Sequence, residues 1–366
     1  MRERLLENLL WFLERPSVTG EEKHLCDDLE ARVSRLPGWK IERFSNNLVV
    51  RRAEPDASRD RISFAGHLDT VPEPEGGLPV RVEGERVYGR GASDMKAGDA
   101  VMLALLEEFS WESSWAEPLF VFYEREEGPF AQNGLDRVFA ESPEVLDANL
   151  ALVLEPTAGA LEVGCVGTAQ IEVTFRGRPA HSARPWQGEN ALTAAGAFLA
   201  GLHERQVEEV VVEGLTFYEV LVPTMARGGR AKNVVPDTFR INVNYRFAPG
   251  KDIEDVRRIF EELLKGGADY VVADYAPSGP VELGNPLLQR LIETGLEVRP
   301  KQAWTDVARF AERGVAAANF GPGLPAQAHQ EVEFTELPLL ERCYERLTSF
   351  SDALLGGADE LPHTGL

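Results

Sequence analysis

The chain has 366 residues, 43% of them hydrophobic, and a formal charge of -22 at pH 7. The length allows about two domains with packed cores, which excludes an intrinsically disordered chain. The acidic balance argues against nucleic acid or an anionic membrane surface as a partner, because both are bound through clustered Lys and Arg.

Helical and strand patterns alternate from the N-terminus to about residue 166. The predicted helices cover residues 2–14, 21–35 and 98–109, and the predicted strands cover residues 62–65, 119–123 and 150–154. The first helix interleaves Glu and Arg along an amphipathic pattern, which distinguishes it from a secretory signal segment. Alternation of this kind predicts an α/β domain with helices on both faces of the sheet.

The pattern changes at about residue 170. A half-exposed strand (170–177) precedes a helix (189–205), two strands (216–226 and 238–247), a helix (252–265) and a strand (270–275). This β-α-β-β-α-β order is typical of a ferredoxin-like α+β domain. Helices and short apolar runs resume after residue 280. We therefore predict an α/β domain of residues 1–168 and 281–357, an inserted domain of residues 169–280, and a Gly-rich tail of residues 358–366.

The cysteine spacing and the hydropathy indicate in which cellular compartment the protein is found. Cys26, Cys165 and Cys343 are far apart in the sequence and form neither a disulfide framework nor a CxxC zinc motif. No run approaches the roughly 20 apolar residues of a membrane span. We expect a cytoplasmic protein with no membrane partner.

Short motifs place acids and histidines at apparent strand or loop ends. They are GHLDTVP (66–72), GRGASDMKAG (89–98), EEG (126–128), LEPT (154–157) and AHQE (328–331). Each has an ordinary explanation when taken alone: the acid pair as solvated charge, a lone His as a surface residue, and Asp94 as the N-cap of a helix that begins near Lys96. Five such motifs together indicate a metal site.

The residue types in these motifs fit a dinuclear hydrolase. Histidine and carboxylate ligands suit two Zn²⁺ ions, with Co or Mn as substitutes, and one bridging carboxylate holds such ions about 3.5–4 Å apart. The candidate ligands are His67, Asp94, Glu127, Glu155 and His329. Glu126 is then free to take a proton from water and deliver it to the leaving nitrogen. Asp69 is placed to accept the second ring N–H of His67 and fix its tautomer.

These motifs, together with AHS at residues 180–182, resemble the zinc aminoacylase and carboxypeptidase family of co-catalytic metallohydrolases. Further segments resemble the succinyl-diaminopimelate desuccinylase branch of that family: GCVGTAQIEV, RPAHSARPWQGENA, KNVVPD, VNYRFAPG, WTDVARF and NFGPG. The resemblance covers nearly the whole chain. It implies a zinc-peptidase-like α/β catalytic domain with an inserted ferredoxin-like dimerisation (lid) domain.

The same resemblance implies roles for individual residues. His67 and Glu155 would hold one zinc, Glu127 and His329 the other, and Asp94 would bridge them. Glu126 would be the catalytic base and Asp69 the orienting carboxylate. His181, in the inserted domain, would reach the partner subunit's site in a homodimer and help polarise the scissile carbonyl.

Substrate contacts are also implied by the resemblance. Arg246 and Asn233 match positions at which desuccinylases bind substrate carboxylates, for which Arg offers bidentate hydrogen bonds. Gly321 to Gly323 could present backbone N–H groups, and Thr305 or Arg309 could assist. The segment AHQEVEF lacks the basic residue expected directly after the final His in close relatives, so one substrate contact there is left open.

The sequence thus predicts a dinuclear zinc amidohydrolase. The leading hypothesis is removal of the N-succinyl group from N-succinyl-LL-2,6-diaminopimelate, giving succinate and LL-diaminopimelate for lysine and peptidoglycan precursors. The alternatives are deacetylation of an N-acetyl amino acid such as acetylornithine, and dipeptide cleavage. A non-catalytic binding protein on the same fold is disfavoured, because the base and all five ligand positions are present.

Overall fold

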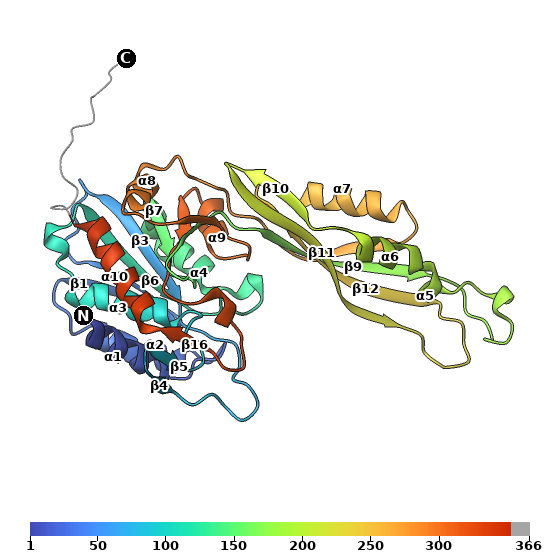
Figure 1. The fold of residues 1–366 in the computed structure, drawn as a ribbon, viewed down its shortest axis with the longest axis horizontal. Helices are drawn as coiled ribbons and strands as arrows, with labels where there is room; N and C mark the ends of the chain where they lie inside the picture. The colour runs from blue at the N-terminus through green and yellow to red at the C-terminus, as the bar shows by residue number, and fades with distance from the viewer. Residues whose placement is uncertain (353–366) are drawn as a thin grey trace, which may run out of the picture. The chain divides into compact units, whose positions relative to one another are not determined.

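The computed structural model describes residues 1–352, which form two compact units (Figure 1). Unit 1 contains Met1–Val163, Glu282–Arg299 and the segment that begins at Arg309, and unit 2 contains Gly164–Val281 and Pro300–Ala308. Residues 300–308 were predicted to belong to the first domain. They cluster with unit 2, where the backbone oxygen of Lys301 accepts from the Val166 N–H at 3.3 Å. The predicted tail, 358–366, lies outside the described residues.

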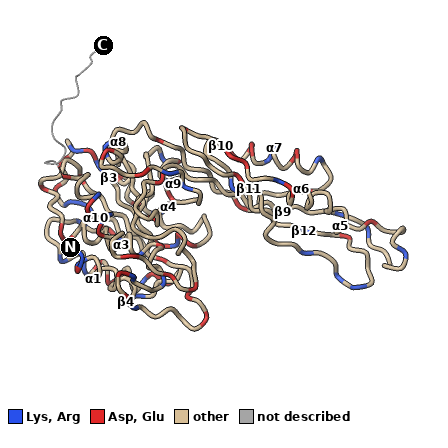
Figure 2. Tube along the Cα trace, in the orientation of Figure 1, with Lys and Arg blue, Asp and Glu red and all other residues tan. Residues whose placement is uncertain are grey.

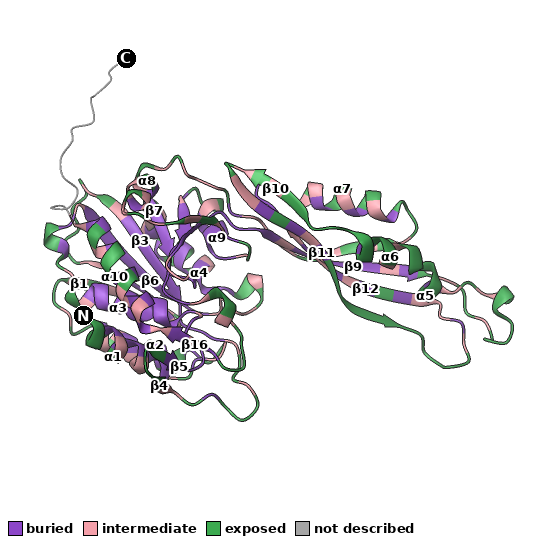
Figure 3. Ribbon diagram, in the orientation of Figure 1, coloured by how far each residue is buried: buried purple, intermediate pink, exposed green. Residues whose placement is uncertain are grey.

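Unit 1 is built on an eight-stranded mixed sheet. In sheet order the strands are β1 (Trp39–Phe44), β2 (Asn47–Arg52), β6 (Ala116–Tyr123), β3 (Asp60–His67), β7 (Leu150–Val153), β15 (Ala317–Asn319), β8 (Leu161–Val163) and β14 (Val298–Pro300). The four neighbours β6, β3, β7 and β15 are parallel. Every residue of β6 and β7 is buried (Figure 3), as expected for parallel strands covered on both faces.

Helices cover this sheet. They are α1 (Arg2–Leu13), α2 (Lys23–Val33), α3 (Lys96–Glu108), α4 (Gly134–Glu141), α8 (Pro286–Glu293), α9 (Val307–Glu312) and α10 (Leu337–Ser351). Helix α3 contacts β3, α1 and α10, and it is buried continuously from Lys96 to Leu106, which explains why it is apolar on nearly all sides. A second, three-stranded sheet has the order β16 (Phe334–Glu336), β5 (Arg86–Tyr88), β4 (Arg81–Glu83).

Unit 2 contains a five-stranded antiparallel sheet. In sheet order the strands are β10 (Glu208–Val212), β11 (Leu215–Gly228), β12 (Thr238–Phe247), β9 (Gly167–Arg176) and β13 (Asp269–Ala276), and the helices are α5 (Ala191–Ala194), α6 (Gly196–Glu204) and α7 (Ile253–Leu264). Buried and half-exposed residues alternate along β9 and β12, so one face of the sheet forms the core. The predicted β-α-β-β-α-β order is present, with β10 as an added edge strand.

Short 3₁₀ helices complete the fold: η1 (Trp111–Ser113), η2 (Phe130–Gln132), η3 (Pro143–Asp147), η4 (Pro185–Gln187) and η5 (Pro325–Gln327). Basic and acidic residues are interspersed along both units, with acids in excess (Figure 2). Within residues 1–352, none of the helices has both the length and the apolar character needed to cross a membrane.

Candidate metal centre

The candidate site begins at the carboxyl ends of three neighbouring parallel strands. His67 is the last residue of β3, Glu126 and Glu127 lie in the loop after β6, and Glu155 lies two residues beyond β7. Because β6, β3 and β7 pair in parallel register, these ends share one edge of the sheet. Such edges are where α/β proteins bind ligands. The apolar strand runs therefore determine where the polar side chains meet.

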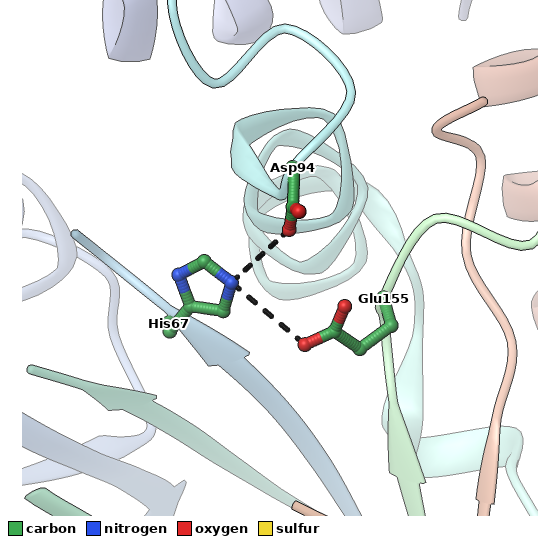
Figure 4. A group of neighbouring side chains, drawn as sticks. All are labelled: His67, Asp94 and Glu155. Carbon is green, nitrogen blue, oxygen red and sulfur yellow. Dashed lines mark hydrogen bonds and ion pairs between the residues drawn. The ribbon is translucent and has the colours of Figure 1, made fainter. Parts of the chain in front are cut away.

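One group consists of His67, Asp94 and Glu155 (Figure 4). The His67 Nε2 atom lies 3.3 Å from Asp94 Oδ1 and 3.7 Å from Glu155 Oε1. The His67 side chain is fully buried, and Glu155 is almost so. Asp94 comes from the loop before α3. The N-cap of that helix is Met95, without a side-chain cap hydrogen bond, so the alternative interpretation of Asp94 as an N-cap is wrong.

A second group consists of Asp94, Glu127 and His329. The His329 Nε2 atom lies 2.9 Å from Glu127 Oε1 and 3.6 Å from Asp94 Oδ2. The two oxygens of the Asp94 carboxylate thus face two different histidines. In each group, one ligand atom from every residue lies within 4.8 Å of the others. This is the arrangement of a carboxylate shared between two cation sites.

The electrostatics of the groups favour a cation. Burial by itself lowers the pKa of His67, but the hydrogen bond with Asp94 and the nearby carboxylates raise that pKa well above its ordinary value. The hydrogen bond with Glu127 likewise raises the pKa of His329. The acids therefore surround both imidazoles with negative potential. Nitrogen and oxygen ligands in such a field fit Zn²⁺, Co²⁺ or Mn²⁺, whose binding displaces the ring protons.

Asp69 anchors the loop that carries the acid pair. Its carboxylate is fully buried and accepts from the Glu126 N–H at 2.9 Å and the Glu127 N–H at 3.1 Å, as well as from the Thr19 hydroxyl at 2.9 Å. The acceptor nearest to His67 Nδ1 is the backbone oxygen of Asp69, at 3.0 Å, whereas the carboxylate lies at 3.6 Å. The backbone oxygen of Asp69, and not the predicted carboxylate, is therefore the nearer partner of the His67 ring.

Glu126 lies in a third group, with His67 and Glu127. Its side chain is half-buried at the same edge of the sheet. The distances alone therefore allow Glu126 to be either a ligand or a base. Its role as the base remains a prediction, and so does the assignment of the other two groups as ion sites.

Two predicted site residues of unit 2, His181 and Asn233, lie on adjacent segments. The Ser182 N–H donates to the backbone oxygen of Asn233 at 2.9 Å, which places Asn233 beside His181. The His181 side chain is exposed, and its Nδ1 accepts from the Ala183 N–H at 3.1 Å. In the neutral imidazole the proton is then on Nε2. His181 therefore presents a hydrogen-bond donor.

Arg246, on β12, has the features of an anion contact. Its guanidinium is partly buried, and burial lowers its pKa. Its Nε donates to Asn244 Oδ1 at 3.1 Å, a neutral partner. Within residues 1–352, no Asp or Glu forms an ion pair with it. Thr305, also in unit 2, is buried, and its role as a substrate contact remains a prediction.

The expected role of Gly321 is wrong. Its N–H donates to Thr157 Oγ1 at 3.1 Å, so this amide is already used within the protein. A Cβ at Gly321 would lie 2.3 Å from the Glu155 backbone oxygen, and one at Gly323 would lie 2.0 Å from that of Ser93. The two glycines allow segments near the candidate ligands to approach closely. The N–H of Gly323 remains a predicted substrate contact.

The Arg309 side chain binds partners within unit 1. Its Nη1 donates to Asp136 at 2.7 Å, and its guanidinium lies over the Phe130 ring, 3.7 Å from the centroid. Its side chain is buried among these partners, which argues against the assisting substrate contact expected of it. It stabilises the segment that follows the acid pair.

Two further anchors were missed by the sequence analysis. Glu124 accepts from Asn46 Nδ2 at 2.8 Å and Asn47 Nδ2 at 3.2 Å, which holds the start of the loop that carries Glu126. Lys96 is buried and donates to the Arg15 backbone oxygen at 2.8 Å, and burial lowers its pKa to about 8. Lys96 lies inside the motif GRGASDMKAG, and Glu124 lies two residues before the acid pair. Only their neighbours were interpreted, because a buried anchor has no sequence pattern of its own.

Comparisons with known proteins agree with this geometry. Residues 63–353 match the model of peptidase family M20/M25/M40. A succinyl-diaminopimelate desuccinylase of Corynebacterium glutamicum is 40% identical over 327 residues, which cover 87% of this chain and 88% of the relative. Among solved structures, the aminopeptidase PepT of Bacillus cereus aligns with a TM-score of 0.79 at 20% identity, covering 96% of this chain and 98% of that one.

A second solved structure, the YXEP protein of Bacillus subtilis, is described as a dinuclear metal-binding peptidase of the M20 family. It aligns with a TM-score of 0.68 at 14% identity, covering 97% of this chain and 98% of that one. Likeness at these identities shows a shared fold. The family model spans most of the described chain, including all the candidate metal ligands. The chain therefore belongs to peptidase family M20/M25/M40.

Proposed function

We propose that this protein is a dinuclear zinc amidohydrolase that converts N-succinyl-LL-2,6-diaminopimelate and water into succinate and LL-diaminopimelate in the cytoplasm. The observation that carries the proposal is the Asp94 carboxylate, whose oxygens face His67 at 3.3 Å and His329 at 3.6 Å. The substrate is proposed from the 40% identity to the Corynebacterium glutamicum desuccinylase. Together they select one reaction among those that a metal-dependent hydrolase can catalyse.

Two ions would be held by the two groups that share Asp94. His67 and Glu155 complete one site, and Glu127 and His329 complete the other. Bound there, Zn²⁺ supplies Lewis-acid polarisation of the amide carbonyl and lowers the pKa of water. The backbone oxygen of Asp69 supports this assignment, because it lies 3.0 Å from His67 Nδ1 and so favours the tautomer that directs the Nε2 lone pair towards an ion.

The protein's own groups move the proton. In the proposed mechanism, Glu126 accepts a proton from the attacking water as the new C–O bond forms, and then donates that proton to the departing nitrogen as the C–N bond breaks. Asp69 holds the loop during both transfers through the amides of Glu126 and Glu127, at 2.9 and 3.1 Å. One carboxylate therefore serves as base and then as acid.

Residues of unit 2 are proposed to bind the substrate. His181 would donate from Nε2 to the scissile carbonyl, and Arg246 and Asn233 would bind a substrate carboxylate and its surroundings. The support is chemical: a donor on an exposed imidazole, and a partly buried guanidinium that has no acidic partner within residues 1–352. A substrate carboxylate would give this partly buried guanidinium an acidic partner, which makes Arg246 the preferred contact.

Substrate choice is tested with an alanine variant of Arg246. We expect Arg246→Ala to lower kcat/KM for the succinyl substrate by about 10–100-fold, since one charge-assisted hydrogen-bond partner is worth about 1.5–3 kcal/mol. Zinc content should be unchanged. The measurement is steady-state kinetics on N-succinyl-diaminopimelate and N-acetylornithine, each with the wild-type and variant proteins.

The matched control for Arg246 is Arg240→Ala, on the same strand. Arg240 is exposed and lies 3.5 Å from Glu172, so its loss should leave kcat/KM nearly unchanged. Wild-type protein should strongly prefer the succinyl substrate. Equal or faster turnover of acetylornithine would remove the desuccinylase assignment and leave only metal-dependent amide hydrolysis.

We also propose that two copies form a homodimer in which His181 of each subunit completes the other subunit's site. The prediction is complementation: His181→Ala and Glu126→Gln proteins, each inactive alone, should recover activity when subunits are exchanged. A mixed dimer contains one site with an intact Glu126 and an intact His181. Its activity should reach about half that of a wild-type dimer, in which both sites work.

The control for complementation is each variant taken through the same exchange procedure alone. Size-exclusion chromatography with light scattering establishes the dimer. If mixed dimers form but stay inactive, His181 acts within its own subunit and the shared-site arrangement is wrong.

A further inference from the structure

Glu333 connects the two segments that carry Asp94 and His329. It lies four residues after His329 and is 1% exposed. Four donors converge on its carboxylate: Arg90 Nη1 at 2.8 Å and the Gly91 N–H at 2.9 Å on Oε2, and the Ser93 N–H at 2.8 Å and the Asp94 N–H at 3.0 Å on Oε1. All four belong to residues 90–94, the segment that positions Asp94.

The arrangement is specific to a carboxylate. Successive backbone N–H groups that point at one anion form a concave binding site, and here the anion is a side chain from a distant segment. The ion pair with Arg90 is also buried, at 7% and 1% side-chain exposure. A neutral or shorter side chain would leave some of these donors unsatisfied, and buried donors without partners are destabilising.

Packing alone holds the two groups of candidate ligands unequally. His67 and Glu155 lie at the ends of buried strands, whereas the His329 side chain is 53% exposed and follows the short helix η5. The backbone of His329 has a φ of 62°, a conformation that a non-glycine residue keeps only when its surroundings impose it. The position of His329 therefore depends on what anchors its segment.

We propose that Glu333 is a positioning residue that ties residues 90–94 to the His329 segment, and so maintains the spacing between the shared carboxylate and the second histidine. That spacing is 3.6 Å between Asp94 Oδ2 and His329 Nε2. This inference rests on the proposed dinuclear site. Two further contacts run beside it: the Gly89 N–H donates to the Glu333 backbone oxygen, and Ser93 Oγ donates to Phe334 O at 2.7 Å.

The two ions should respond differently to loss of this anchor. The ion held by Asp94, Glu127 and His329 should bind about 10–100-fold more weakly, the usual cost of removing a partner that orients metal ligands. The ion held by His67, Asp94 and Glu155 should weaken less, because two of its ligands lie at the ends of buried strands. Loss of Glu333 should therefore weaken the binding of one ion more than that of the other.

The experiment titrates Zn²⁺ into metal-free full-length protein by calorimetry with competing chelators. Glu333→Gln keeps the size of the side chain but puts an NH₂ donor against backbone donors. The matched control is Glu331→Gln, the same charge change at an exposed position in the same loop. Arg90→Gln removes the ion pair but keeps the three backbone donors. Hydrogen exchange of residues 91–94 is measured on the metal-free proteins, which separates positioning from any effect of the ions.

Wild-type and Glu331→Gln proteins should bind two ions alike. The Glu333→Gln protein should bind one of the two ions about 10–100-fold more weakly, and the amide hydrogens of residues 91–94 should exchange faster. The Arg90→Gln protein should lie closer to wild type in both zinc affinity and hydrogen exchange. If Glu333→Gln does not fold, Glu333→Asp keeps the charge and should show a smaller loss of the same kind. Two ions bound with wild-type affinities, or both weakened equally, would overturn the role of Glu333. Failure of the wild type to bind two ions would instead refute the proposed function.

Discussion

Replacing Glu126 with glutamine is expected to lower kcat by about 10²–10⁴-fold, the range that a positioned general acid-base group contributes. The carboxamide keeps the shape of the side chain and leaves the backbone N–H of residue 126 bonded to Asp69, but it cannot accept the proton of the attacking water. Two zinc ions per subunit should remain. Steady-state kinetics and elemental analysis of the same preparation measure both quantities.

The control for this experiment is Glu141→Gln, an equal change of charge at an exposed position in the last turn of α4. It should retain wild-type kcat and metal content. Loss of one zinc ion from the Glu126→Gln protein would mean that Glu126 is a ligand, as its proximity to His67 and Glu127 allows. In that case the base must be sought elsewhere.

Replacing Asp94 with alanine is expected to have the largest effect on metal content. Its oxygens face His67 at 3.3 Å and His329 at 3.6 Å, so both proposed ion sites would lose a ligand at once. Each affinity should fall by more than the roughly 10–100-fold that an outer-shell partner costs. Activity should drop to the background rate, and circular dichroism should show a folded protein.

The comparison variant is His329→Ala, which removes a ligand from one group only. After gel filtration, this protein should keep about one ion, whereas the Asp94→Ala protein should keep neither. Full retention of one ion by Asp94→Ala would place Asp94 in a single site. The shared carboxylate would then be an incorrect interpretation of the geometry.

Much of the fold was predictable because its core elements have strong local patterns. Strands β6 and β7 are continuous apolar runs, and β9 and β12 alternate clearly. The hairpin of β1 and β2 was missed because β1 is mostly half-exposed and its apolar residues do not alternate cleanly with polar ones. The edge strand β10 was missed because it is only five residues long and begins with two acids.

The proximity of the candidate ligands was predictable from the sequence, but the hydrogen bonds that support their segments were not. The candidate ligands lie within short motifs, so their residue types and order are visible in the sequence. The supports are hydrogen bonds between distant positions: Gly321 to Thr157 across 164 residues, and Asp94 to Glu333 across 239. Such pairs depend on tertiary packing, which brings together segments that have no pattern in common. From the sequence alone, the polar groups that form these supporting hydrogen bonds are therefore expected to contact solvent or substrate.

Asp69 couples the positions of Glu126 and Glu127. Its two carboxylate oxygens each hold one backbone amide, that of Glu126 on one side and that of Glu127 on the other. Glu126, proposed to carry the proton, and Glu127, proposed to hold an ion, are therefore both positioned by the Asp69 carboxylate. A metal of different radius that drew Glu127 inward would also move Glu126, so we expect the choice of ion and the efficiency of proton transfer to change together.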